Sequence, residues 1–143
     1  MTTRTLRNRI MRVLMISLLP GCRPDRPAGS GDSRDRIAIS QLLPPMKGDS
    51  LSITLVEVSY GPGASSPPHS HPCPVVGHVI SGALHTQVEG EPERTYRAGE
   101  SFYEKPNSIH LVSGNASVKD SVTFLAYFVC DHQASLSVPM AEN

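Results

Sequence analysis

The sequence predicts an all-β protein of the sandwich or barrel class, and three observations support this fold class. Short runs that alternate apolar and polar residues recur throughout residues 51–130, at a spacing typical of antiparallel strands. Glycine, proline and asparagine, which favour turns, separate these runs. No segment has a convincing helical period over about ten residues or more, apart from a weak turn at residues 37–43.

Each expected strand is justified by its own pattern. The first, residues 51–60, places Leu51, Ile53 and Leu55 on one face, and the Gly-Pro-Gly of residues 61–63 ends it. Runs separated by turn residues predict further strands at residues 75–80, 84–88, 94–97, 101–104 and 110–112. The last, residues 121–130, is apolar on both faces, which is typical of a central strand covered on each side. The tail after His132 is expected to form an irregular cap.

The formal net charge of +0, from 13 basic and 13 acidic residues, hides two segments of opposite sign. Residues 1–36 carry eight Arg and three Asp, a charge of +5, whereas residues 37–143 carry five basic and ten acidic side chains, a charge of −5. An acidic domain argues against nucleic acid or an anionic surface as its partner, because both attract basic surfaces. We therefore expect one folded domain, residues 37–143, that binds no nucleic acid.

Residues 1–21 resemble a secretory signal peptide. Four arginines precede the apolar run at residues 13–19, which is too short to span a bilayer. Cys22 follows Leu19-Pro20-Gly21, an arrangement that resembles the lipobox of bacterial lipoproteins, in which the cysteine is acylated. We expect an exported protein, either periplasmic or anchored to the membrane by a lipid on Cys22. The alternative is a cytoplasmic protein with an unstructured leader.

Residues 22–36 are expected to be a disordered linker, because Pro, Gly, Ser and mixed charges cannot bury enough apolar area to offset chain entropy. In an oxidising compartment the two domain cysteines, Cys73 and Cys130, could pair, although the sequence does not imply it. The alternative is two buried, small apolar side chains. Cys73 is also a candidate metal ligand or redox partner, with a small packed side chain as the simpler expectation.

Two of the six histidines have a spacing suited to metal binding. His69 and His71 are two residues apart, so in an extended segment both imidazoles point the same way and can reach one ion. Imidazole nitrogen is a common ligand of divalent transition metals. The pair alone is weak support for a metal site, and the surrounding motifs add to it.

Two motifs resemble those of the cupin superfamily. Gly63, then His69-Ser70-His71, a hydrophobic strand and Gly82 are similar to the first motif, and the second is similar to the segment from Gly99 through Pro106 and His110 to Asn115. The likeness covers residues 42–129 and is strongest to small, single-domain bacterial cupins of the type-2 group. It implies an antiparallel jelly-roll barrel that holds a divalent metal through His69, His71 and His110. Homodimerisation is compatible with it, because cupins often pair subunits along an exposed sheet edge.

One departure from the motif changes the expected charge of the site. The usual fourth ligand is a glutamate, and Val75, followed by Val76, stands in its place. Three neutral imidazoles can still hold a metal and leave positions open for water or substrate. Such a site would keep a charge of +2 and favour a small anionic ligand that binds through two oxygens, such as an enolate or a carboxylate. The second motif also has one residue more than usual between Gly99 and Pro106.

The sequence gives weaker support for a catalytic or ligand role of other polar residues. Tyr103 or Glu104 could reach the barrel mouth as a general acid or base, although a solvent-facing edge carboxylate is the simpler expectation for Glu104. His78 has the parity opposite to His71 and is expected to face away from the site. His85 is expected to be exposed, and no role is assigned to His132.

The leading functional hypothesis is a metal-binding cupin that acts as a small-molecule oxygenase or isomerase. The metal could be Fe, Mn, Ni, Cu or Zn, since imidazole accepts all of them. The alternative is a binding or sensing module that uses the barrel pocket without chemistry, because fold alone does not give function. A third possibility is a degenerate barrel in which the histidines only fill space.

Overall fold

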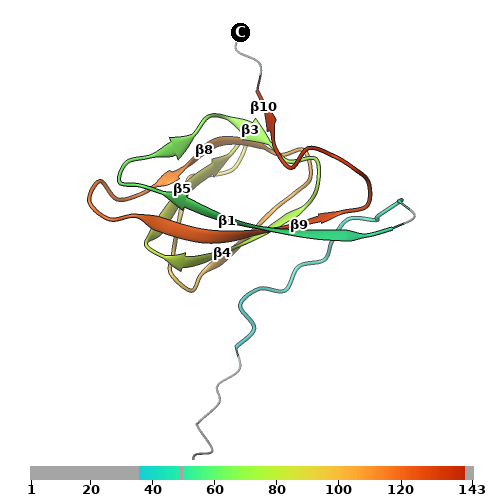
Figure 1. Ribbon diagram of the computed structural model, residues 1–143, viewed down its shortest axis with the longest axis horizontal. Helices are drawn as coiled ribbons and strands as arrows, with labels where there is room; N and C mark the ends of the chain where they lie inside the picture. The colour runs from blue at the N-terminus through green and yellow to red at the C-terminus, as the bar shows by residue number, and fades with distance from the viewer. Residues whose placement is uncertain (1–35, 49, 141–143) are drawn as a thin grey trace, which may run out of the picture. The chain divides into compact units, whose positions relative to one another are not determined.

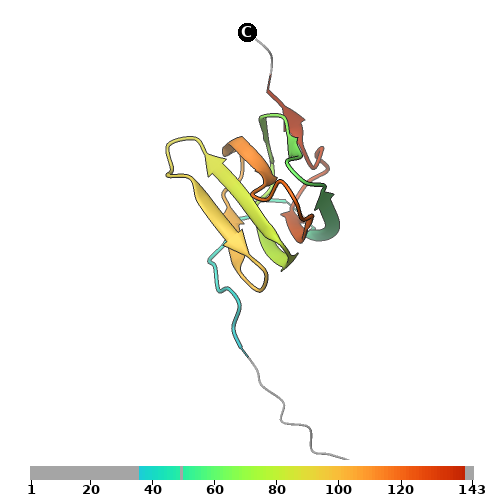
Figure 2. The same cartoon turned by 90° about the vertical axis from the view of Figure 1, so that its left-hand side faces the viewer.

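The computed structural model describes residues 36–48 and 50–140, which fold into two antiparallel β-sheets. The two sheets enclose a common interior (Figure 1, Figure 2). Within this part of the chain there is no helix, and therefore none long and apolar enough to cross a membrane. The all-β fold class is thus confirmed, while the expected leader, residues 1–21, and all of the expected linker but Arg36 lie outside the described residues.

One sheet has four strands in the order β1-β9-β4-β7. Their bounds are Ser52–Tyr60 for β1, Val122–Cys130 for β9, Val75–Ser81 for β4 and Ser101–Glu104 for β7. Strand β9 lies between β1 and β4, as its apolar pattern on both faces predicted, and pairs with β1 over its whole length and with β4 over residues 123–128. Alternate residues of β9 are buried in the interior, and those between them are half-buried.

The other sheet has the order β10-β3-β8-β5-β6, and β2 pairs with β8 beside this path. The bounds are Val138–Pro139 for β10, His69–Ser70 for β3, Ile109–Asn115 for β8, Ala83–Val88 for β5, Arg94–Arg97 for β6 and Ser65–Ser66 for β2. Strand β8 is longer than expected, and the two-residue strands were not expected at all. This sheet therefore carries β3, which contains His69 and is followed directly by His71, and β8, which contains His110.

The C-terminal tail is not merely an irregular cap. Its strand β10 pairs with β3, and the backbone N–H of Met140 donates to the carbonyl of Pro68 at 3.1 Å. At the other end of the domain, residues 37–43 form no helical turn. The tail departs from the expectation because it pairs with a distant strand, which local propensity does not reveal, whereas residues 37–43 belong to no helix or strand.

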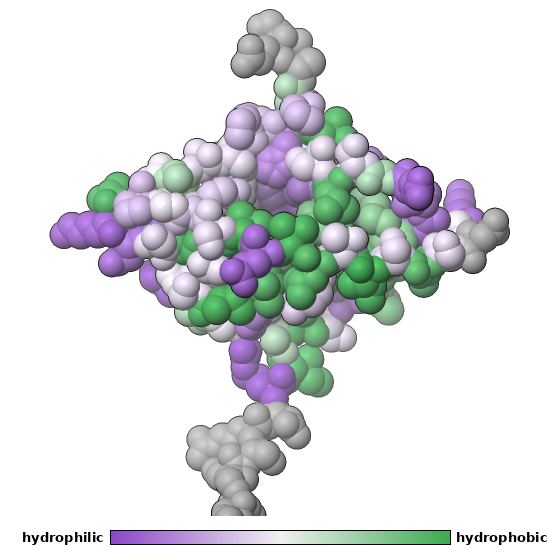
Figure 3. All heavy atoms as spheres, viewed as in Figure 1, coloured by the Kyte–Doolittle hydropathy of each residue, from purple (hydrophilic) through white to green (hydrophobic). Residues whose placement is uncertain are grey.

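The core lies between the sheets and is formed by apolar residues of both. Phe124 and Phe102 are stacked at a tilt, with ring centroids 6.2 Å apart, and Tyr60 extends this group from β1, 5.8 Å from Phe124. On the opposite face of β1, Ile53 and Leu55 remain 72% and 51% exposed. Figure 3 shows apolar side chains gathered on this side of the molecule. The face of this four-stranded sheet that packs in the core, rather than the exposed face of β1, borders the interior of the barrel.

The cysteines of the domain form a disulfide, Cys73–Cys130, with their Cα atoms 5.2 Å apart. It joins the segment before β4 to the end of β9, and both cysteines are buried. Of the readings that the sequence left open, the structure therefore shows pairing. A paired sulfur is not free to ligate a metal, so Cys73 is no longer a candidate ligand in this state.

Asn115 and Gly82 act as turn residues, as the sequence indicated. The Nδ2 group of Asn115 donates to the carbonyls of Tyr60, Gly61 and Asp120 at 3.3, 2.9 and 2.7 Å. Gly82, between β4 and β5, has φ of 76°, a conformation that glycine adopts without strain. These contacts fix the loops at the ends of the barrel.

Candidate metal centre

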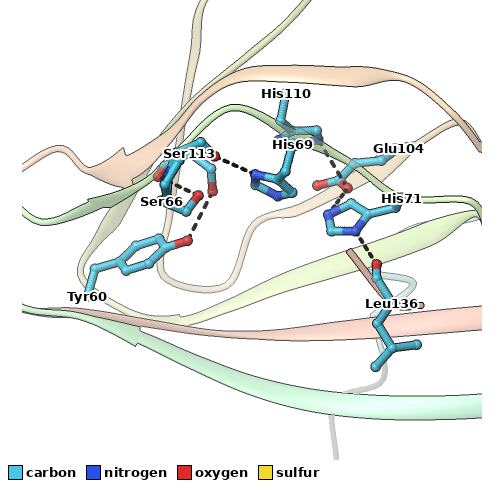
Figure 4. A network of polar contacts seen from close by, with 9 residues as sticks. Tyr60, Ser66, His69, His71, Glu104, His110, Ser113 and Leu136 are labelled. Carbon is cyan, nitrogen blue, oxygen red and sulfur yellow. Dashed lines mark hydrogen bonds and ion pairs between the residues drawn. The ribbon is translucent and has the colours of Figure 1, made fainter. Parts of the chain in front are cut away.

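Three histidines from neighbouring strands meet inside the barrel (Figure 4). Antiparallel pairing sets His69 on β3 opposite His110 on β8, and His71 follows β3 directly. The ring centroids of His69 lie 4.8 Å from His71 and 5.3 Å from His110, and those of His71 and His110 lie 5.6 Å apart. The structure brings together the three side chains that the sequence nominated, and their role as metal ligands stays a prediction.

Backbone carbonyls orient two of the three rings. The Nδ1–H of His69 donates to the carbonyl of Pro67 at 2.8 Å, and that of His71 donates to the carbonyl of Leu136 at 2.5 Å. A carbonyl only accepts, so each ring carries its proton on Nδ1 and has a lone pair on Nε2. This tautomer is the one in which Nε2 can bind a metal, with the carbonyl as an outer partner.

The third ring, His110, has no hydrogen-bond partner for either nitrogen, although it is only 4% exposed. The same holds for Oε2 of Glu104, a residue that is 7% exposed. Leaving buried polar atoms unpaired costs about 1–3 kcal/mol each, and more for a charged group. Such atoms call for an explanation, and a bound cation would satisfy them.

The sequence-based expectation that Glu104 is a solvent-facing edge carboxylate is wrong. Glu104 points into the barrel from the end of β7, and its Oε2 lies 3.1 Å from Nε2 of His110 and 3.6 Å from Nε2 of His71. The sequence did hold a signal for this placement. Glu104 shares its parity with Phe102, and an aromatic residue that packs in the core carries its i+2 neighbour inward as well.

Tyr103 has the opposite parity on β7 and does not take part in this cluster. Its side chain is half-buried, and burial raises the pKa of its phenol. It therefore stays protonated at neutral pH, and the structure does not support it as a general base.

The environment of His71 favours the neutral imidazole. Desolvation by burial lowers its pKa, and the neighbouring rings of His69 and His110 act in the same direction. The carbonyl of Leu136 and the carboxylate of Glu104 oppose this effect only in part. Since neutral imidazole is the form that binds a metal, His71 is prepared for ligation at neutral pH.

The donor set fits a divalent transition metal in its chemistry, although its side chains are not gathered tightly around one point. No group of three or more His, Cys, Asp or Glu side chains within residues 36–48 and 50–140 forms an assembled metal cluster. The rings of His69 and His110 are stacked, at 28° to each other, rather than aimed at a common centre. The fit therefore rests on unpaired nitrogens, the unpaired carboxylate oxygen and the Nδ1-protonated rings.

An interior cavity of about 80 Å³ is lined by the three histidines and Glu104. His69 and His71 also line an apolar hollow of about 360 Å³ at the barrel mouth, together with Phe128 and Leu136. The two histidines thus stand between the mouth and the interior. A small molecule that enters through this apolar mouth would reach the histidines first.

The remaining histidines lie away from the cluster. His78 Nδ1 is bonded to Oγ of Ser101 at 2.8 Å on the face of β4 that does not line the interior. His85 makes an ion pair with Glu93 at 3.3 Å, and His132 pairs with Asp131 at 2.6 Å. The structure therefore leaves only His69, His71 and His110 as histidines of the candidate centre among the described residues.

The two antiparallel sheets that enclose a common interior place the chain in the class of β-barrel proteins, and three imidazoles lie in that interior. Residues 56–128 match the family model of the cupin domain, Cupin_2, and the chain therefore belongs to the cupin family. No curated protein sequence matches the chain.

Solved cupin structures resemble the fold. A Bacillus subtilis oxalate decarboxylase structure concerned with its Mn(II) centres has 29% identity and a TM-score of 0.52, over 62% of this chain and 24% of that one. An oxalate oxidase in complex with the substrate analogue glycolate has 24% identity and a TM-score of 0.51, over 57% and 44%. A DMSP lyase from Ruegeria pomeroyi DSS-3 has 21% identity and a TM-score of 0.52, over 64% and 44%. The chain thus spans less than half the length of these neighbours, and the last two support the fold alone.

Proposed function

We propose that this cupin binds a divalent transition metal through His69, His71 and His110 and uses it in a small-molecule reaction, as an oxygenase or an isomerase. The observation that carries the proposal is the meeting of three imidazoles, two with Nε2 left free by backbone bonds and one buried without a hydrogen-bond partner. The Mn(II) centres of the similar oxalate decarboxylase support a divalent metal as the ligand. Fe, Mn, Ni, Cu and Zn all remain candidates.

The residues around the proposed centre would have different roles in binding. When bound, the metal would supply a Lewis acid that polarises the oxygens of an anionic substrate. The carbonyls of Pro67 and Leu136 hold the rings of His69 and His71 at the inner end of the mouth. The apolar wall that includes Phe128 would receive the hydrocarbon part of the substrate.

Metal analysis of the purified domain tests the first half of the proposal. After dialysis and loading with each candidate metal in turn, the wild-type chain should retain about one ion per chain, while His69→Ala and His110→Ala should lose it. His132→Ala is the matched control, because this exposed histidine lies outside the cluster and should leave the metal content unchanged. A wild-type chain that retains no metal, or histidine variants that retain it fully, would refute the proposal.

The apolar mouth also favours a second function, the binding or sensing of a small ligand without turnover. Its volume and lining suit a molecule with an apolar body and an anionic end. Enolic and phenolic acids are suitable probes for both functions. Oxygen consumption or product formation with the metal-loaded protein would favour catalysis, whereas a rise in Tm without turnover would favour binding.

We further propose that the protein is exported and anchored by a lipid on Cys22. The disulfide supports an oxidising compartment, since such bonds persist there and are rare in the cytosol. In cells, Cys22→Ala should release the protein from the membrane fraction. A variant that stays membrane-associated would count against the lipid anchor.

A further inference from the structure

Glu104 is a buried carboxylate for which the fold provides no counter-charge with good geometry. Its Oε2 accepts no hydrogen bond and is shielded from water. The two imidazoles beside it, His110 at 3.1 Å and His71 at 3.6 Å, are close enough for an ion pair. However, neither contact is aligned as a hydrogen bond, and an unpaired charge in the interior is among the most costly features a fold can retain.

The spacing of these donor atoms is that of neighbouring ligands on one ion. Nitrogen and oxygen ligands bind divalent transition metals at about 2.0–2.2 Å, which places adjacent donors roughly 2.8–3.1 Å apart in octahedral sites and roughly 3.3–3.6 Å apart in tetrahedral sites. The separations of 3.1 and 3.6 Å between Glu104 Oε2 and the two Nε2 atoms are close to these ranges. His69 completes the set if its ring turns out of the stack with His110.

Strand register explains how a residue of β7 comes to this place. Glu104 pairs directly with Val75 of β4, and both side chains point into the interior, with Val75 only 1% exposed. Side chains of directly paired residues are neighbours on one face of a sheet, with Cβ atoms about 4.5–5.5 Å apart. A carboxylate on either strand can therefore serve the same point, and this chain has valine on β4 and glutamate on β7.

We propose that Glu104 is a fourth protein ligand of the metal, supplied by β7 to a centre whose other donors are His69, His71 and His110. This inference rests on the proposed metal binding. Three imidazoles and one carboxylate leave a divalent centre with a charge of +1, not the +2 that the sequence implied. Two positions of an octahedral ion would stay open, enough for a small anion that binds through two oxygens.

The test compares Glu104→Gln with the wild type and with Glu93→Gln, a control that removes an exposed carboxylate beside His85. The amide has the shape of the carboxylate without its charge. Co(II) is the probe, with the dissociation constant measured by titration and the geometry by visible absorption. We expect Glu104→Gln to weaken Co(II) binding by at least about tenfold and to change the spectrum, and Glu93→Gln to change neither.

A second readout separates a ligand from a structural ion pair. In the metal-free protein, Glu104→Gln should raise Tm, because it removes an unpaired buried charge, and in the Co(II)-loaded protein it should reduce the gain in Tm. A structural ion pair with a histidine predicts the opposite sign in the metal-free protein. The double variant Val75→Glu with Glu104→Val, which moves the carboxylate to the paired strand, should recover part of the lost affinity.

The outcomes distinguish this inference from the proposed function. Wild-type affinity and an unchanged spectrum in Glu104→Gln would overturn the role of Glu104. If His69→Ala loses Co(II) in the same experiments, the proposal of a three-histidine metal site would still be supported. A wild-type chain that binds no Co(II) or other divalent metal would overturn both.

Discussion

Gly77 on β4 lies directly opposite Phe102 on β7, and the phenyl ring covers the glycine. A Cβ added at Gly77 would lie 2.0 Å from Cζ of the ring and 2.3 Å from Cε1, a separation that no packed structure tolerates. The glycine therefore makes room for the aromatic ring that sits two residues before Glu104. The placement of the carboxylate depends on this close approach.

Gly77→Ala should destabilise the protein, since the ring must move within a filled core, at a cost of about 1–3 kcal/mol. Gly61→Ala is the control, because a Cβ there meets no atom within 4 Å. Chemical denaturation of both variants measures the difference in the free energy of unfolding. Equal stabilities for the two variants would show that Phe102 adjusts without strain.

The loss of stability as the pH falls from about 4 to about 2 should depend in part on Asp131. Its carboxylate accepts hydrogen bonds from Nδ1 of His132 and from the backbone N–H groups of Lys47 and Gly48, which lower its pKa from 3.8 to about 2. A lowered pKa in the folded state contributes stability above the unfolded value, and this contribution is lost as the pH falls from about 4 to about 2. The Tm difference between wild type and Asp131→Ala should therefore shrink over this window. A constant difference from about pH 5 to about pH 2 would contradict the assignment.

Reduction of the disulfide should lower stability strongly. The bond joins cysteines separated by 57 positions, and closing a loop of that length stabilises a domain by about 4 kcal/mol on the chain-entropy model. We expect a decrease in Tm of more than about 10 °C with reductant. The double variant Cys73→Ser, Cys130→Ser should have a low Tm that reductant does not change, and Cys22→Ser should respond like the wild type. Insensitivity of the wild type to reductant would show that the bond does not form.

Metal affinity should depend on the C-terminal segment, if the proposed centre is present. A chain that ends at Ala134 loses the carbonyl of Leu136, which accepts from Nδ1 of His71, and also loses β10. Outer partners of this kind affect metal affinity by about 10–100-fold. Val138→Ala keeps all these backbone groups and serves as the control. Titration with Co(II) gives both constants, and an unchanged affinity in the truncated chain would show that the carbonyl does not support the ring.

Much of the barrel could be predicted because apolar and polar residues alternate along most of its longer strands. The central place of β9 was predicted from its apolar pattern, and the turn at Gly82 from its composition. The apolar face that the pattern indicated for β1, Leu51, Ile53 and Leu55, is instead the exposed face. The strands β2, β3 and β10 have two residues each, too few to show any period. They exist because a distant strand pairs with them, and a local pattern does not contain that information.

The candidate site was predicted in part for the same reason. His69 and His71 share one face by parity, and His110 was nominated by its motif. Glu104 was considered only as an acid or base at the barrel mouth, although its parity with Phe102 indicated an inward side chain. Its position beside Val75 depends on the register between two strands, which the sequence does not show. Likewise, the sequence did not show which cysteines pair, since the bond between Cys73 and Cys130 depends on the approach of two chain segments.

The disulfide makes the folded chain a covalent ring, residues 73–130, with two tails. Glu104 and His110 belong to the ring, His69 and His71 to the N-terminal tail, and the carbonyl of Leu136 to the C-terminal tail. A single cut by a protease within the ring would leave the fragments joined, whereas a cut between residues 66 and 72 would free the N-terminal tail. An ion held by donors of both parts would be a second cross-link between tail and ring, one that a chelator can open while the first stays closed.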